Sequence, residues 1–398
     1  MLVPAVGRKG FGLKEGFCEN ENLPETMLAR GLRLEEDLRA FKSQNPVPDY
    51  GWYPYQSLAS LPVVSRLLGH VPEEALCGPI ADLGCGDGEW SVLLAQTGAE
   101  VDAIDHRESN FNQMRGADLL RRALAPAVAL HDLDLDRYFS LPRRDYGLIL
   151  FLGTLYHLKN PYHVLETLAS AGDWCVLSTR IARLAPHTGA RIEDEPMAYL
   201  LDRREANNDP TNFWIFTAAG LRRLAERTGW MVIASEHLGC TTDSDPVRAD
   251  RDERIFMLLR SRTRHPELWV RPLGGWHEIE NGWRWTARVF AIEVVLPPAP
   301  TAEFALRFTI PEVVIAAGAP VVMTCRCEGA LAGSISCDQA ETIEFRGRFP
   351  ENTPPGSVLH LEFEVESAFA PAGDERELGV IVPVIEAANL HGIPFRIS

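Results

Sequence analysis

The chain has 398 residues, of which 46% are hydrophobic and 24% are charged, a composition typical of a soluble globular protein. Its formal net charge of −16 repels a phosphate backbone, so broad binding to nucleic acid is disfavoured. No apolar stretch is long enough to span a bilayer, and residues 1–17 lack the apolar core of a secretion signal. We therefore expect a cytoplasmic protein without a membrane span.

The eight cysteines are irregularly spaced, which favours free thiols in a reducing compartment. Cys325, Cys327 and Cys337 are the one group close enough to suggest a metal site. Structural zinc normally takes four ligands at more regular spacing, so buried thiols in a strand are the favoured interpretation. We expect no metal.

The first 70 residues predict a helical extension. Residues 24–44 carry apolar side chains at helical spacing, and a proline-rich break follows at 45–49. An aromatic turn at 51–55 precedes a second expected helix over 57–68.

Strands and helices alternate from Pro79 to about residue 265. The repeated β-α pattern predicts a mostly parallel, doubly wound sheet, which is a Rossmann-like α/β fold over residues 71–265. The expected strands are 80–83, 100–104, 127–130, 146–152, 174–178, 230–236 and 254–259, and the expected helices are 89–96, 107–124, 161–171 and 217–228.

The pattern changes after Arg264. Residues 266–398 contain short alternating runs separated by glycine and proline, with no amphipathic segment of helix length. This pattern predicts an antiparallel β-sandwich. The clearest expected strands are 289–296, 305–310, 358–365 and 378–385.

The strongest functional motif is the segment Ile80–Trp90, which reads Ile-Ala-Asp-Leu-Gly-Cys-Gly-Asp-Gly-Glu-Trp. Glycines at a strand–turn–helix junction let a ligand approach the backbone and the helix N-terminus. Asp82 places an anion where a pyrophosphate would be repelled, which suits a ligand with a cationic amine and a sulfonium. Asp105, at the end of the next strand, is placed to take two ribose hydroxyls. The alternative is that the glycines only make a turn and Asp105 only caps a helix.

This motif resembles motif I of the class I S-adenosylmethionine-dependent methyltransferases, and the resemblance extends over about residues 75–262. It implies a seven-stranded sheet and S-adenosylmethionine as the cofactor. Asp132 resembles the residue that meets the adenine amine, with Asp134 as a rival and a plain surface turn as the alternative. The resemblance implies these cofactor-binding residues: Asp82, Gly84, Cys85, Gly86, Asp105, His106, Asp132, Leu133 and Phe151.

A second motif, Gly153-Thr-Leu-Tyr-His-Leu-Lys-Asn-Pro161, follows the fourth expected strand. It is similar to a signature of the subfamily that contains the tRNA wobble-uridine carboxymethyltransferase. The similarity implies that Tyr156 lies near the transferred group. His157 is either a general base for a hydroxyl or a histidine that only packs against the loop.

The chain departs from that tRNA enzyme at its N-terminal side. No match is found to the basic segment that recognises the carboxylated cofactor there, which puts both that cofactor and a tRNA substrate in doubt. A segment ending at Trp214 resembles a substrate-side segment of the same broad group, and the aromatic turn is a candidate lid. The candidate acceptor-binding residues are therefore Tyr53, Tyr55, Asn212 and Trp214, with packing as the alternative.

Two segments of the β region, 274–285 and 374–380, resemble β-sandwich domains of bacterial surface-polysaccharide enzymes. Trp276, Trp283 and Trp285 either stack on sugars or belong to the core. We therefore expect an O-methyltransferase that acts on a sugar, a glycan or a related small metabolite. A tRNA-modifying (carboxy)methyltransferase and a catalytically idle cofactor-binding scaffold are the alternatives, and the sequence predicts no oligomeric state.

Overall fold

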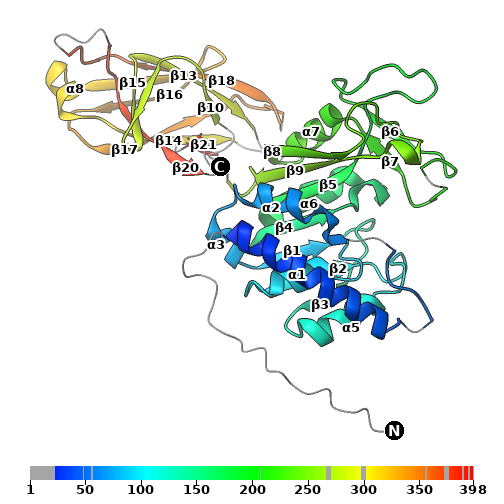
Figure 1. The fold of residues 1–398 in the computed structure, drawn as a ribbon. Helices are drawn as coiled ribbons and strands as arrows, with labels where there is room; N and C mark the ends of the chain where they lie inside the picture. The colour runs from blue at the N-terminus through cyan, green and yellow to red at the C-terminus, as the bar shows by residue number, and fades with distance from the viewer. Residues whose placement is uncertain are drawn as a thin grey trace.

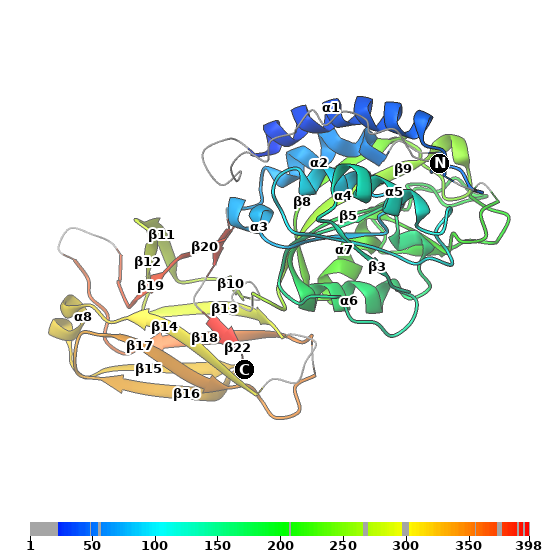
Figure 2. The same cartoon turned by 90° about the horizontal axis from the view of Figure 1, so that it is seen from below.

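The computed structural model describes residues 23–397, except 48, 55–56, 207, 266–269, 297–301, 355, 372–375, 388–389 and 393–394. Figures 1 and 2 show an α/β part built by the first two thirds of the chain and a group of β-sheets built by the last third. No helix in the described part is long and apolar enough to cross a membrane.

The α/β part is organised by one nine-stranded sheet. Its main path runs β3-β2-β1-β4-β5-β9-β8, in which the first five strands are parallel and β9 is antiparallel to both β5 and β8. Two short strands, β6 (Ala198–Leu200) and β7 (Trp214–Phe216), join the edge of β5 and bring the count above the seven expected. The main strands are β1 (Ile80–Leu83), β2 (Val101–Asp105), β3 (Ala129–Asp132), β4 (Tyr146–Leu152), β5 (Gly172–Ile181), β8 (Trp230–Gly239) and β9 (Glu253–Ser261).

Helices cover both faces of this sheet (Figure 1). Side chains of β4 alternate between the two layers, so Leu148 and Leu150 enter one core while Ile149 and Phe151 enter the other. The first core is covered by α1 (Leu23–Gln44), α2 (Leu61–Leu68), α4 (Glu89–Ala95) and α5 (Arg115–Leu124), and the second by α6 (Pro161–Ala171) and α7 (Ala218–Arg227). The remaining short helices of this part are η1 (Ser57–Ser60), α3 (Glu73–Cys77), η2 (Leu155–His157) and η3 (Ala249–Arg251).

The expected helix 107–124 is wrong in its first half. The side-chain oxygen of Asn110 accepts hydrogen bonds from the backbone N–H groups of Asn112 (3.1 Å) and Met114 (2.8 Å). These local bonds offer the backbone an alternative to the helix, and Met114 has a positive φ of 62°. The helix therefore starts only at Arg115. The other expected helices of the α/β part are confirmed to within a few residues.

The last third forms two antiparallel sheets that share one hydrophobic core, which confirms the expected sandwich. The short strands Ile385–Ala387 and Leu390–Gly392 form a separate two-stranded sheet. Phenylalanines from both sheets meet in this core, for example Phe345 of β17 with Phe363 of β18 at 5.5 Å between ring centroids. One sheet has the order β10-β13-β18-β15-β16, and the other has β11-β12-β19-β14-β17 with β22 beside β14. The strands are β10 (Val270–Pro272), β11 (Trp276–Glu280), β12 (Trp283–Thr286), β13 (Val289–Val295), β14 (Glu303–Thr309), β15 (Val321–Cys327), β16 (Ala330–Cys337), β17 (Thr342–Arg348), β18 (Val358–Val365), β19 (Ile381–Pro383), β20 (Ile385–Ala387), β21 (Leu390–Gly392) and β22 (Phe395–Ile397).

Three details of this region bear on the sequence expectations. A six-residue helix, α8 (Glu312–Ala317), interrupts the strands where none was expected. Cys325 and Cys327 are free, buried thiols on β15, and burial raises the pKa of the Cys327 thiol to about 11. Trp276 and Trp285 are half-buried and pack against the sandwich core, which supports the packing interpretation over an exposed stacking surface.

Candidate cofactor and acceptor site

The turn after β1 has a backbone that requires glycine. Gly84 and Gly86 have φ values of +68° and +59°, in the left-handed region. A Cβ atom on Gly84 would lie 2.0 Å from the Oγ1 atom of Thr154, so the turn and the loop after β4 touch directly. The glycine turn therefore lies at the carboxyl edge of the sheet, beside the second motif, where open α/β sheets bind ligands.

Asp82 lies at the end of β1 and is 3% exposed. Its carboxylate accepts a hydrogen bond from the Ser91 hydroxyl at 2.6 Å. Burial raises the pKa of Asp82 to about 7, and the nearby carboxylates Glu89 and Asp105 add to the rise against that hydrogen bond. A buried carboxyl group in this state is stabilised by any cationic group that binds beside it.

Asp105 ends β2 and reaches across the glycine turn. Its carboxylate accepts hydrogen bonds from the backbone N–H groups of Gly86 (2.9 Å) and His106 (2.7 Å), and from the Asn110 amide (3.0 Å). Burial raises the pKa of Asp105 against these hydrogen bonds, which act to lower it. The structure therefore brings Asp105 to the turn, as the spacing predicted.

The end of β3 is more exposed. The Asp132 carboxylate accepts hydrogen bonds from the backbone N–H (2.9 Å) and Nε (3.1 Å) of Arg107, and these contacts lower its pKa. Asp134 instead accepts a backbone N–H two residues on and pairs with Arg137, which is a local turn contact. Leu133 is half-buried and donates its backbone N–H to the Asp105 carbonyl at 2.8 Å.

Other predicted cofactor residues differ in accessibility. His106 places its Nδ1 3.2 Å from the Ser109 hydroxyl, next to Asp105. Cys85 is buried within the turn, where burial raises the pKa of its thiol well above the ordinary range. Phe151 has 0% exposure and its side chain lies in the core, so its ring offers no surface to a ligand in this structure.

The N-terminal segment covers the glycine turn. The ring of Tyr53 lies 3.8 Å from the position that a Cβ on Gly86 would occupy. The backbone N–H of Tyr53 donates to the Asp87 carboxylate at 2.9 Å, and its hydroxyl accepts the N–H of Phe111 at 2.9 Å. Tyr53 was predicted on the acceptor side, but this position puts it against the cofactor-side turn. Tyr55 lies outside the described residues.

A buried ion cluster beneath this segment was not predicted. The Nζ atom of Lys42, at the end of α1, pairs with Asp87 at 3.0 Å and with Glu89. The same ammonium group lies 5.0 Å from the centre of the Trp52 ring. Asp87 and Glu89 lie within the glycine motif, but their partner, Lys42, lies on α1, which is distant in the sequence.

The second motif places two side chains at the end of β4. Tyr156 and His157 lie in η2 with their ring centroids 4.2 Å apart. The Nδ1 atom of His157 lies 3.2 Å from the Thr211 carbonyl oxygen, and burial lowers the pKa of His157. A neutral His157 that donates its Nδ1 proton to this carbonyl keeps a lone pair on Nε2. The loop therefore offers a neutral proton acceptor.

The substrate-side segment packs against the same loop. The backbone N–H of Phe213 donates to the Tyr156 carbonyl at 2.8 Å. Asn212 is buried, and its amide donates to the Ala206 carbonyl at 3.0 Å, while its side-chain oxygen has no partner among the described residues. Trp214 is half-buried in β7 and packs against the second core. The segment is therefore joined to the loop that carries Tyr156 and His157 through the Phe213 backbone.

Two arginines that the sequence did not point to complete this end of the site. Arg180 of β5 and Arg254 of β9 lie directly opposite each other in the antiparallel ladder. Both contact the carboxylate of Asp252, Arg180 through a short Nε contact and Arg254 at 3.6 Å. The Nη2 atom of Arg254 lies 3.5 Å from the Tyr156 hydroxyl. Guanidinium groups therefore border the second motif.

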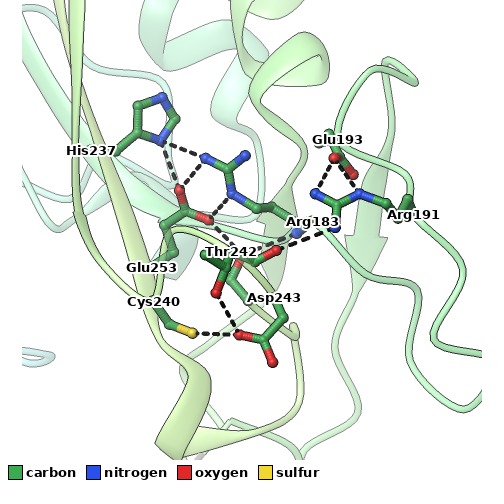
Figure 3. A network of polar contacts seen from close by, with 9 residues as sticks. Arg183, Arg191, Glu193, His237, Cys240, Thr242, Asp243 and Glu253 are labelled. Carbon is green, nitrogen blue, oxygen red and sulfur yellow. Dashed lines mark hydrogen bonds and ion pairs between the residues drawn. The ribbon is translucent and has the colours of Figure 1, made fainter.

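A polar network joins the segment after β5 to β8, β9 and the loop between them (Figure 3). Glu253 is fully buried and accepts hydrogen bonds from Arg183 (2.7 and 2.9 Å) and Ser244 (2.6 Å), with His237 at 2.8 Å. Burial opposes ionisation, but these partners outweigh it and hold the pKa of Glu253 at about 2. Because Glu253 stands between Asp252 and Arg254 in the chain, this network fixes the backbone that presents both.

The fold is a doubly wound α/β sheet whose carboxyl edge carries a glycine turn beside buried carboxylates. The family model described as a methyltransferase domain matches residues 58–235, which include the turn and the second motif. Residues 58–235 are therefore similar to a methyltransferase domain, and the sheet that they help to build has a Rossmann-like α/β architecture.

Solved structures give similarities of low identity. The N-terminal domain of EvdMO1, crystallised in the presence of SAH and D-fucose, is 19% identical over 60% of this chain and 97% of its own, with a TM-score of 0.37. A methyltransferase from Mesorhizobium loti is 20% identical over 51% and 98% of the two chains, with a TM-score of 0.36. A didemethyltoxoflavin methyltransferase from Burkholderia thailandensis is 14% identical over 60% and 88%, also with a TM-score of 0.36. These values carry no residue role or substrate over to this chain. No curated protein sequence matches the chain.

Proposed function

We propose that the chain transfers a methyl group from S-adenosylmethionine to an oxygen atom of a sugar, a glycan or a related small metabolite. The observation that carries the proposal is the left-handed Gly84–Gly86 turn, with buried Asp82 below it and Asp105 across it. The room beside Gly86, where the nearest atoms to an added Cβ are those of the Tyr53 ring at 3.8 Å, and the raised pKa of Asp82 fit a cationic ligand held against the backbone.

In this proposal, one set of residues holds the cofactor. Asp82 faces the positive end of the ligand, and Asp105 exchanges its backbone partners for the ribose hydroxyls. Asp132 and Leu133 border the adenine, while Cys85, Gly86 and His106 line the path between them. When bound, S-adenosylmethionine supplies a methyl group that is activated by a positively charged sulfur.

A second set of residues orients the acceptor. Tyr156 borders the reacting groups, and His157 takes the hydroxyl proton on Nε2 while Nδ1 stays bonded to the Thr211 carbonyl. Alignment of the two reactants supplies most of the acceleration, on the order of 7–11 kcal/mol in well-oriented systems. A lowered His157 pKa keeps the base neutral at pH 7.

The division of the chain follows the same proposal. The described residues between 23 and 70 form a helical extension over the cofactor turn, those of 71–265 form the methyltransferase domain, and those of 266–398 form an accessory β-sandwich. The resemblance of residues 274–285 to polysaccharide-enzyme domains supports a carbohydrate acceptor.

Calorimetric titration with S-adenosylmethionine tests the cofactor half of the proposal. Wild-type protein is expected to bind, and Asp105→Ala is expected to bind roughly 10- to 100-fold more weakly because a charged hydrogen-bonding group is lost. Asp118→Ala removes a half-buried carboxylate on α5 that pairs only with Arg121 and Arg122 among the described contacts, and it should bind normally. Unchanged binding in Asp105→Ala would contradict the proposed site.

Transfer of a labelled methyl group separates an enzyme from an idle scaffold. If the cofactor binds but no label reaches any sugar or metabolite fraction, the proposed activity is wrong. Label that appears only in tRNA would favour the tRNA-modifying alternative.

A further inference from the structure

Thr211 connects His157 to a carboxylate. The Oγ1 atom of Thr211 lies 3.1 Å from Nδ1 of His157 and 2.6 Å from Oδ1 of Asp209. The backbone carbonyl oxygen of Thr211 lies 3.2 Å from the same ring nitrogen. The Nδ1 atom of His157 therefore contacts two oxygen atoms of one residue, and that residue is bound to Asp209.

The segment Asp209-Pro-Thr-Asn212 builds this chain of contacts locally. The backbone N–H of Asn212 donates to the Asp209 carbonyl at 3.1 Å, which closes a β-turn with proline at its second position, where the fixed φ of proline is favoured. The Asp209 carboxylate also accepts the backbone N–H of Thr211 at 2.9 Å. The turn therefore holds Thr211 and its carboxylate partner as one unit beside the loop of His157.

The contact with Asp209 determines where the protons lie. A carboxylate only accepts hydrogen bonds, so the Thr211 hydroxyl donates its proton to Asp209. Both oxygen atoms of Thr211 are then acceptors towards the ring, and Nδ1 of His157 carries a proton. A neutral His157 keeps its lone pair on Nε2, which forms no hydrogen bond with a described residue.

Charged groups from several elements act on His157. The titratable and charged groups around the ring come from its own loop, β5, the start of β9 and the turn before β7: Tyr156, Arg180, Asp252, Arg254 and Asp209. Burial is the largest effect and lowers the pKa of His157, and the two arginines lower it further. The Thr211 carbonyl and the Asp209 charge act in the opposite direction and raise it. Asp209 therefore makes the buried ring a stronger base than burial alone would leave.

We propose that Thr211 and Asp209 are positioning residues that hold neutral His157 as the Nδ1–H tautomer and stabilise the imidazolium formed when Nε2 takes a proton from the acceptor. The inference rests on the proposed function. As the acceptor oxygen gains the methyl group, its O–H bond breaks, the proton moves to Nε2, and Nδ1–H stays bonded to Thr211. An amine that is already neutral needs no such base, so this arrangement favours an alcohol hydroxyl as the acceptor.

Nuclear magnetic resonance of the imidazole nitrogens in the full chain tests the arrangement without an acceptor. Their chemical shifts identify the tautomer, and wild-type His157 is expected to be protonated on Nδ1 when neutral. Asp209→Asn keeps an oxygen that can accept from Thr211 and removes the charge, so the pKa of His157 is expected to fall. Asp202→Asn is the matched control. Asp202 accepts the backbone N–H of Arg204, two residues on, at 3.1 Å but contacts no described histidine, so the His157 pKa should not change.

Transfer of a labelled methyl group to a sugar and metabolite fraction tests the role in the reaction. Thr211→Val keeps the shape of the side chain and removes Oγ1, and the rate is expected to fall roughly 10- to 100-fold because a hydrogen bond to a ring that becomes charged is lost. Thr211→Ser restores the hydroxyl and should recover most of the rate. In Asp209→Asn, the rate should fall and the acid limb of its pH profile should move to lower pH, since a weaker base stays neutral to a lower pH. Circular dichroism checks that each variant is folded.

The outcomes separate this inference from the function on which it rests. An Nε2–H tautomer in the wild type, or a His157 pKa that Asp209→Asn does not lower, would overturn the arrangement of protons. An unchanged pH profile of methyl transfer in Asp209→Asn would overturn the positioning role. If the wild type transfers no label, the proposed function is wrong, and the resonance experiment still decides whether Thr211 and Asp209 control the protonation of His157.

Discussion

At the β1–β2 end of the sheet edge, carboxylates are buried with few cations, whereas at the β5–β9 end the guanidinium groups of Arg180, Arg183 and Arg254 contact the carboxylates of Asp252 and Glu253. The comparison is clearest for two buried acids. Asp82 has one neutral hydroxyl donor and a pKa of about 7, whereas Glu253 has two basic partners and a pKa of about 2. Asp82 thus remains able to gain from a cationic ligand, while the charge of Glu253 is already satisfied by the protein.

This difference separates two charge environments along one edge. A cationic ligand is favoured beside Asp82, whereas Arg180 and Arg254 already contact the Asp252 carboxylate. The Gly153–Thr154 loop lies between the two environments.

The largest expected effect comes from breaking the basic end. Glu253→Gln leaves Arg183 and His237 without their buried anion and is expected to lower the free energy of unfolding by about 3–5 kcal/mol. Denaturant titration measures the change. Glu236→Gln, in an exposed pair with Arg66, is the control and is expected to cost no more than about 1 kcal/mol. Equal losses in the free energy of unfolding for the two substitutions would show that the buried Glu253 network stabilises the fold no more than an exposed ion pair does.

Breaking the acidic end should act on ligand binding more than on folding. Gly84→Ala adds a Cβ that collides with Thr154. The alanine must also adopt the left-handed backbone conformation of Gly84, and that conformation alone costs about 1–2 kcal/mol. We expect the affinity for S-adenosylmethionine to fall at least about tenfold in calorimetry. Gly98→Ala is the control. Gly98 also has a positive φ, +87°, but nothing lies within 4 Å of the added Cβ, so this variant has the backbone strain without the collision. A comparable loss of affinity in both variants would contradict the assignment of the turn.

The pH dependence of cofactor binding sharpens the comparison. The pKa of Asp82 is raised to about 7, so a cationic ligand must bind the ionised form and release a proton below that pH. Affinity is expected to rise about tenfold per pH unit up to about pH 7 and then level off. Without ligand, the same raised pKa contributes stability below about pH 3.8 that is lost as the pH rises through about 7. Asp82→Asn should flatten both profiles, and an unaltered affinity profile would exclude Asp82 as their source.

The smallest expected effect reports on the acceptor end. Burial is the main reason that the pKa of His157 is lowered, and the positive charges of Arg254 and Arg180 add to it. Arg254→Met should therefore raise the His157 pKa part of the way towards its ordinary value of about 6.5. Nuclear magnetic resonance titration of the imidazole measures this shift. A pKa that stays constant or falls would place Arg254 too far from His157 to act on it.

The parts of the fold that were predicted from the sequence are local. The apolar run of β4, the Thr217 cap of α7 and the glycine turn could be predicted because each is determined by a few consecutive residues. Asp105 was predicted because parallel neighbouring strands end at the same edge. The expected helix start at residue 107 was wrong because the side-chain oxygen of Asn110 accepts hydrogen bonds from nearby backbone N–H groups, which replace helical hydrogen bonds.

The parts that were missed depend on long-range register. Arg180 and Arg254 meet only because β9 runs antiparallel to β5 in one particular alignment, and a shift of one residue would turn one of them to the other face. Lys42 reaches Asp87 from a helix that precedes the domain matched by the family model. Neither the arginine pair nor Lys42 lies in a sequence motif that spacing or composition would reveal.

The position of Tyr53 against Gly86 has a thermodynamic consequence. Residues 49–53 are held to the turn through Asp87, and the cofactor is proposed to bind at the same turn. Any ligand that competes with Tyr53 for this surface releases the segment, and any ligand that adds to its contacts orders the segment further. By linkage, the measured affinity for the ligand then contains the free energy of ordering this segment, and amide hydrogen exchange at Phe111 would report its sign.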